Sequence, residues 1–117
     1  MEINPAEKHR GRCECESDIE NGMLQFFYQN RGKWGEYMTE TMQKRFNIAV
    51  VHTSCFTTVD LRSYRLGYNE RMTEYIDEKH GPKTMGKTMD EIHTYRKKIY
   101  DEYVKKHKLD AKRESAG

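Results

Sequence analysis

The chain has 117 residues and a mass of 14.0 kDa, which is enough for one domain and too little for two separate cores. Leu, Ile, Val and Phe together number 18, below the roughly 20% of a chain at which folding alone becomes doubtful. The formal net charge is only +2, whereas disorder normally accompanies a high net charge. The composition therefore predicts a folded domain with a thin core, filled by its 8 Tyr and 7 Met.

The sequence also limits the cellular compartments in which we expect the protein to act. Its longest unbroken apolar run is Ile48-Ala49-Val50-Val51, whereas a membrane-spanning helix needs about twenty apolar residues. The first residues, Met1 to Pro5, lack the apolar stretch of a secretory signal. Three cysteines are an odd number in such a chain, so we expect reduced thiols and a cytoplasmic setting instead of a disulfide framework.

Residues 1–16 are polar and mixed in charge, and they predict an N-terminal arm before a single helical domain over 17–109. Ser17 and Glu20 have the spacing of a capping box, which predicts a first helix up to a turn at 30–33. A second helix is expected next. The expected core faces have helical spacing: Ile19, Met23, Phe26 and Phe27 in the first helix, and Trp34, Tyr37, Met38, Met42 and Phe46 in the second.

The segment Ile48 to His52 is short and rich in β-branched residues, so it is the one strand candidate. A buried strand needs partners for its backbone groups. Three alternatives remain open at this point: pairing with the N-terminal arm, pairing with a second copy of the chain, or no strand at all.

A long third helix is expected after Thr57 or Thr58, ending at His80-Gly81-Pro82. Gly67 in its interior costs up to about 1 kcal/mol relative to Ala, and it would permit a close helix crossing. A fourth helix is expected to start at Thr88, with Glu91 completing a capping box. Its expected core face is Met89, Ile92, Tyr95 or Arg96, Ile99, Tyr103 and Val104, and residues 110–117 are expected to form a disordered tail.

Together these elements predict a mainly α fold: a small bundle of about four helices with at most one short strand and frayed termini. An α/β fold would need strands alternating with helices along the chain.

Residues 81–88 match the P-loop pattern letter for letter, from Gly81 through Gly86, Lys87 and Thr88. A true P-loop follows a buried strand, and its backbone N–H groups and lysine hold phosphates. Here the preceding residues 74–80 are charged and helical in period. We therefore interpret the motif as the end of one helix and the cap of the next, and we reject a nucleotide cofactor.

Cys13, Cys15, His52 and Cys55 together offer the three thiols and one imidazole of a structural zinc site. A metal would also stabilise a chain so poor in aliphatic residues. Against zinc, the Cys13–Cys15 spacing is unusual and both residues lie in the polar arm. The alternative is that Cys55 is a small core residue and the other two are exposed thiols, with no cofactor bound.

We expect no enzymatic activity, because no nucleophile–base pair is evident and adjacent carboxylates such as Asp101 and Glu102 diverge on a helix. Nucleic-acid binding is an alternative, because residues 79–117 carry 11 basic and 6 acidic side chains. Tyr95, Tyr100 and Tyr103 are interleaved with these and could stack on bases. The basic candidates are Lys83, Lys87, Arg96, Lys97, Lys98 and Lys105.

The favoured hypothesis is a small binding or regulatory protein, of the inhibitor or adaptor type, that acts through a Tyr/Arg/Met-rich helical surface. Such side chains are enriched where proteins meet. Self-association, as a homodimer for instance, would cover apolar area that one small chain buries poorly. The candidate partner-binding residues are Trp34, Tyr37, Arg62, Arg65, Tyr68 and Arg71.

Overall fold

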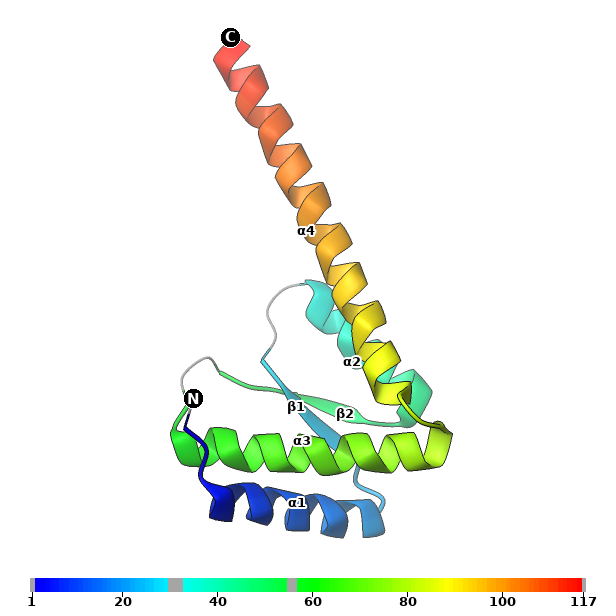
Figure 1. Ribbon diagram of the computed structural model, residues 1–117. Coiled ribbons are helices and arrows are strands. Elements are labelled where there is room, and N and C mark those ends of the chain that lie inside the picture. The colour runs from blue at the N-terminus through cyan, green and yellow to red at the C-terminus, as the bar shows by residue number, and fades with distance from the viewer. Residues whose placement is uncertain (1, 30–32, 55–56, 117) are drawn as a thin grey trace.

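The computed structural model describes residues 2–29, 33–54 and 57–116, with side chains placed for all of these except 33, 34 and 109–116. The elements in chain order are α1 (Pro5–Glu20), β1 (Gln25–Tyr28), α2 (Lys33–Phe46), β2 (Ala49–His52), α3 (Val59–His80) and α4 (Thr84–Ala116) (Figure 1). The mainly α class with four helices is confirmed. One detail differs, because the described residues form two short strands instead of at most one.

The two strands form a parallel pair, with Gln25 opposite Ala49 and Tyr28 opposite His52. This pairing answers the open question about residues 48–52: the partner is β1, from a segment that the sequence predicts as helix. Asn69 of α3 fixes the other edge of β1, since its side chain accepts from Phe27 N at 2.9 Å and donates to Phe27 O at 2.7 Å. An amide thus takes the place of a third strand.

The N-terminal residues expected as an arm form most of α1, which lies along α3 (Figure 1). Asn4 caps α1 and donates from its side chain to Asp60 of α3 at 2.9 Å. The two helices approach closely at two glycines: a Cβ on Gly11 would lie 2.0 Å from the Tyr64 carbonyl oxygen, and one on Gly67 would lie 2.0 Å from that of Lys8. The close crossing expected at Gly67 is therefore confirmed.

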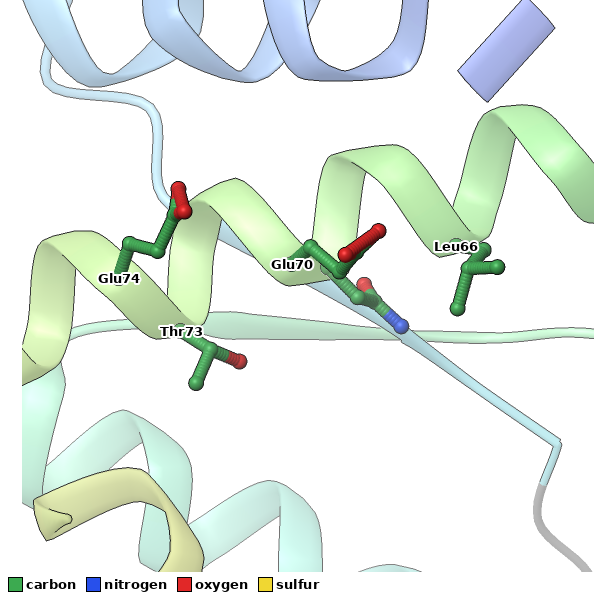
Figure 2. Close-up of a pocket in the computed structure, with 5 residues that line it drawn as sticks. Leu66, Glu70, Thr73 and Glu74 are labelled. Carbon is green, nitrogen blue, oxygen red and sulfur yellow. The ribbon is translucent and has the colours of Figure 1, made fainter. Parts of the chain in front are cut away.

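Ion pairs line the same helix contact. Lys8 Nζ lies 3.0 Å from Glu70 Oε2, and Arg12 Nη2 lies 2.6 Å from Glu74 Oε2. Figure 2 shows Glu70 and Glu74 on α3, where they line a shallow hollow of about 290 Å³ together with Leu66 and Thr73. Both carboxylates already have cationic partners on α1, and the residues that line the hollow all belong to α3.

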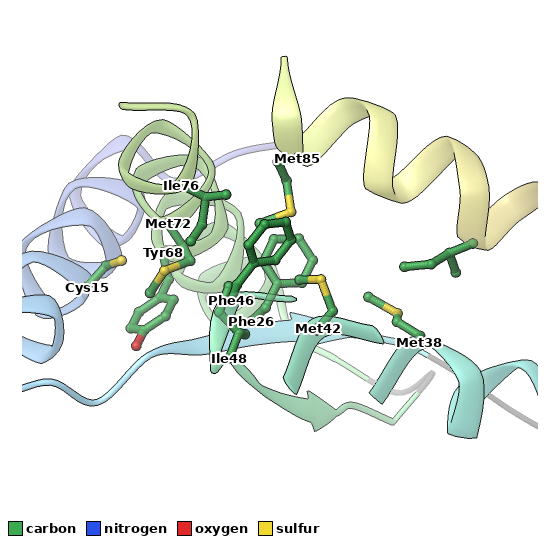
Figure 3. Close-up of a cluster of buried hydrophobic side chains, with 11 residues drawn as sticks. Cys15, Phe26, Met38, Met42, Phe46, Ile48, Tyr68, Met72, Ile76 and Met85 are labelled. Carbon is green, nitrogen blue, oxygen red and sulfur yellow. The ribbon is translucent and has the colours of Figure 1, made fainter. Parts of the chain in front are cut away.

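The core lies between α2, α3, the strands and the start of α4 (Figure 3), and it is as rich in Met as the composition predicts. Met38, Met42, Met72 and Met85 are each at most 2% exposed. Thioether side chains fill irregular gaps well but specify shape poorly. The remaining buried apolar residues are Cys15, Phe26, Phe46, Ile48, Tyr68, Ile76 and Ile92.

The turn between α3 and α4 corrects the expected start of the last helix. Gly81 (φ 112°) ends α3, and α4 begins at Thr84 instead of Thr88. Asp77, in the last turn of α3, accepts a hydrogen bond from Met85 N at 2.9 Å, so a residue outside α4 caps it. Thr88 is buried inside the helix and donates to the Thr84 carbonyl oxygen at 2.9 Å.

The C-terminal end of α4 also differs from expectation. The helix runs on to Ala116, through most of the 110–117 segment predicted as a disordered tail.

In the part of the chain that the structure describes, no helix is both long and apolar enough to cross a membrane.

Candidate partner-binding surface

The C-terminal half of α4 extends away from the other elements (Figure 1). With 33 residues, α4 is about 50 Å long at 1.5 Å per residue. Its first half packs into the core through Met85 and Ile92. Side-chain contacts that also hold it to the body include Glu91 with Arg45 at 2.6 Å, His93 Nε2 with the Tyr28 hydroxyl at 3.2 Å, and the ring of Tyr95 stacked on Tyr37 at 4.1 Å. The pKa of Glu91 is lowered by its hydrogen bond to Arg45. We call residues 96–108 the projecting segment.

Four apolar side chains, Ile99, Tyr100, Tyr103 and Val104, lie along the projecting segment, and we call them the apolar stripe. Their spacing of one, three and four residues places them on neighbouring positions of a helix surface. Tyr100 is 61% exposed and Tyr103 is 60% exposed. The sequence pattern predicts Ile99, Tyr103 and Val104 as core residues, because periodicity shows which face of a helix is apolar but not where the rest of the protein ends.

The apolar stripe lies among basic side chains. Residues 96–108 contain six Lys and Arg against Asp101 and Glu102, a net charge of +4. The lysines at positions 97, 98, 105, 106 and 108 are all exposed. This half of α4 therefore combines exposed aromatic area with positive charge.

The structure does not gather the predicted partner-binding residues on one surface. Tyr68 is 1% exposed and donates to Asp18 at 2.6 Å. Tyr37 is half-buried under Tyr95, and Arg71 contacts Glu16, Glu74 and Glu78. Arg62 and Arg65 lie together at the start of α3, and the Trp34 side chain is outside the described residues.

The basic residues of the nucleic-acid alternative are spread along α4. Lys83 lies in the turn just before α4 and Lys87 in its first turn, whereas Arg96, Lys97, Lys98 and Lys105 follow further along the helix. Lys87 and Lys105 are 18 residues apart, about 27 Å along the helix axis. The start and the projecting half of α4 are thus separate basic regions.

The P-loop-like residues 81–88 lie in the α3–α4 turn and the first turns of α4. The residues that precede them are the end of α3, a helix, where a P-loop has a buried strand. The interpretation of the motif as a helix boundary is therefore supported by its surroundings, with the start of α4 moved to Thr84.

The four candidate zinc ligands do not come together where the structure describes them. Cys13 is exposed, with its sulfur 3.4 Å from His9 Nε2, while Cys15 is fully buried against α3. His52 is exposed on β2, where its Nε2 lies 3.1 Å from Thr39 Oγ1. Cys55 lies outside the described residues, and no group of three His, Cys, Asp or Glu side chains suited to a metal ion is found among the others.

The two described thiols are expected to react at very different rates. Burial raises the pKa of Cys15 to about 12, so only about one thiol in ten thousand is ionised at pH 8. In a Cys55→Ser variant, we expect the thiol reagent DTNB to modify Cys13 alone in the native state and Cys15 only in guanidinium. A Cys13→Ser/Cys55→Ser variant should then show no native reaction. Rapid native modification of Cys15 would contradict the burial of this face of α1.

A comparison of the chain with protein-family models, with curated proteins and with solved structures finds no match.

Proposed function

We propose that this protein is a non-enzymatic binding protein, of the adaptor or inhibitor type, that inserts the apolar stripe of α4 into an acidic groove on a protein partner. The observation that carries the proposal is the exposure of Tyr100 and Tyr103 by 61% and 60% on a helix segment that extends away from the body. Helices that dock into grooves use apolar anchors three and four residues apart. Exposed tyrosines are among the residues that dominate binding energy.

The charge of the projecting segment supports an acidic partner. Its net charge of +4 would attract a negative groove and speed association. The same charge opposes self-association through this surface, because two copies would bring like charges together. Light scattering tests whether the chain self-associates.

Nucleic acid is the weaker candidate for the same surface. Asp101 and Glu102 lie in the middle of the projecting segment and are exposed, so they would face or flank a phosphate backbone and repel it. If this helix followed the phosphate backbone, Ile99 and Val104 would not reach the base edges, and their apolar side chains would have no partner. An apolar groove in a protein accommodates both.

A cytoplasmic setting stays part of this proposal. Cys13 and Cys15 are both free thiols, which suits a reducing compartment.

The test compares two double variants of the full chain in binding to whatever partner the wild-type protein captures. Tyr100→Ala/Tyr103→Ala removes the anchors, and Leu61→Ala/Leu66→Ala removes exposed apolar groups of α3 that are 39% and 40% exposed. We expect the tyrosine variant to raise the dissociation constant about 30-fold or more and the leucine variant to leave it unchanged. Neither should change the free energy of unfolding by more than about 0.5 kcal/mol.

Two results would contradict the proposal. One is equal weakening by both variants, because the apolar stripe would then have no special role. The other is loss of the partner after nuclease treatment, which would favour the nucleic-acid alternative. Binding to the acidic groove should also weaken as salt is raised.

A further inference from the structure

A hollow of about 230 Å³ lies at the carboxyl ends of the two parallel strands, beside the start of α3. Gln29 follows β1, and Thr53 and Ser54 follow β2, so the parallel pairing brings these residues to the same edge. Arg62 and Arg65, in the first two turns of α3, line the same hollow. In open parallel sheets, ligands bind at this edge because the residues after each strand converge there.

The charge lining this hollow is unbalanced. Arg62 and Arg65 line it, and none of its described lining residues is an Asp or Glu. Arg62 Nη2 donates to the Glu2 carbonyl oxygen at 3.1 Å, a neutral acceptor that leaves the charge of the guanidinium uncompensated.

Among the arginines whose side chains the structure describes, Arg65 has no ionic or hydrogen-bonding partner. Arg10, Arg12, Arg45 and Arg71 each pair with at least one glutamate. Arg65 is half-buried, and within the described residues no hydrogen bond or ion pair involves its side chain. A half-buried guanidinium presents five donors, and those of Arg65 are available to a ligand.

Neutral residues complete the lining. Gln29 and Thr53 border the hollow and carry amide and hydroxyl donors, and Phe27 and Leu66 add apolar surface. Two cations together with amide and hydroxyl donors favour an anion. The volume has room for a phosphoryl group with a small substituent, and it is smaller than the roughly 300–1,000 Å³ typical of sites for larger organic ligands.

We propose that this hollow is a binding site for a small phosphate monoester, held by Arg62 and Arg65. A phosphate monoester carries a charge of about −1.5 to −2 at pH 7, which two guanidinium groups would balance. Planar guanidinium groups bind phosphate oxygens through paired hydrogen bonds. The site is separate from the projecting segment of α4, so either proposal can fail without the other.

The test is a calorimetric titration of the full chain with inorganic phosphate, glycerol 3-phosphate and acetate. We expect both phosphates to bind with millimolar or lower dissociation constants and acetate to bind at least about tenfold more weakly. Arg65→Met, which keeps most of the aliphatic stem, should raise the phosphate dissociation constant about tenfold or more. Arg12→Met removes the same charge outside the hollow and should leave that constant unchanged.

The variants also separate specific binding from general attraction. Arg62→Met should weaken phosphate binding as well, and it gives an independent readout if Arg65→Met fails to fold by circular dichroism. Equal weakening by Arg12→Met and Arg65→Met would overturn the proposal, since only overall charge would matter. Two other results would overturn the proposal. One is acetate binding as tightly as phosphate. The other is no heat of binding from either phosphate at about 50 mM, a concentration above the expected millimolar dissociation constants.

Discussion

Gly67→Ala is expected to lower the free energy of unfolding by about 3 kcal/mol, the upper part of the usual range for overpacking. The new Cβ would lie 2.0 Å from the Lys8 carbonyl oxygen, and 2.8 Å from the carbon of the same carbonyl. Both atoms belong to the backbone of α1, so no side-chain rotation relieves the clash. The two helices must move apart, which disturbs the buried face of α1 around Cys15 and the ion pairs along the contact. Urea denaturation measures the loss.

Gly86→Ala is the matched control for this substitution. Gly86 is also helical, but a Cβ there would meet nothing within 4 Å. Replacing a helical glycine by alanine in open space stabilises a protein by roughly 0.5–1 kcal/mol. The two variants should therefore shift the midpoint of unfolding in opposite directions. A Gly67→Ala protein that is as stable as Gly86→Ala would mean that α1 does not lie against α3 in solution.

Tyr68→Ala is expected to cost about 4 kcal/mol, in the range measured for deleting a buried aromatic ring. Tyr68 is 1% exposed, and its ring packs edge-on against Phe27 with centroids 5.0 Å apart. Its hydroxyl donates to Asp18 of α1 at 2.6 Å. Burial, followed by the hydrogen bond to Asp18, raises the pKa of Tyr68 far above its usual value. The hydroxyl therefore remains protonated, as a donor, at neutral pH.

Two further variants divide this effect into its parts. Tyr68→Phe keeps the ring and removes only the hydroxyl, so it should cost about 1.5–3 kcal/mol for the lost hydrogen bond to a charged acceptor. Tyr100→Ala removes an exposed tyrosine of α4 and should change the stability by less than about 0.5 kcal/mol. Chemical denaturation of all three variants gives the comparison. Similar losses for Tyr68→Ala and Tyr100→Ala would refute the division between core and surface tyrosines.

This division also connects the fold with the proposed function. The tyrosines of the chain look alike in sequence, yet Tyr68 stabilises the α1–α3 contact while Tyr100 and Tyr103 remain exposed. Contacts at Glu91, His93 and Tyr95 hold the first half of α4 against the body. The second half is thereby presented as a preformed helix, which reduces the ordering entropy that binding would cost.

The sequence by itself determined the features that depend on local periodicity and composition. The mainly α class and the face of α2 that carries Met38 and Met42 follow from apolar spacing. The β-branched residues around Val50 indicate the one strand candidate, although the sequence leaves open whether it forms a strand and with which partner. The helix end at Gly81 follows from residues that cannot continue a helix. Each of these features is encoded within one or two turns of the chain, where intrinsic preferences and core burial agree.

Tertiary contacts decided the rest. Helix α1 packs against α3 through Gly11, the buried Cys15 and ion pairs. The sequence of α1 therefore lacks the repeating apolar residues from which a packed helix is predicted. The pair Phe26-Phe27 fits a helix or a strand, and β2 on one edge with Asn69 on the other makes it a strand. The start of α4 at Thr84 depends on Asp77 of α3, whose side chain accepts a hydrogen bond from Met85 N. Exposure of the apolar stripe likewise depends on where the body ends, because a repeating pattern specifies a face but not what covers it.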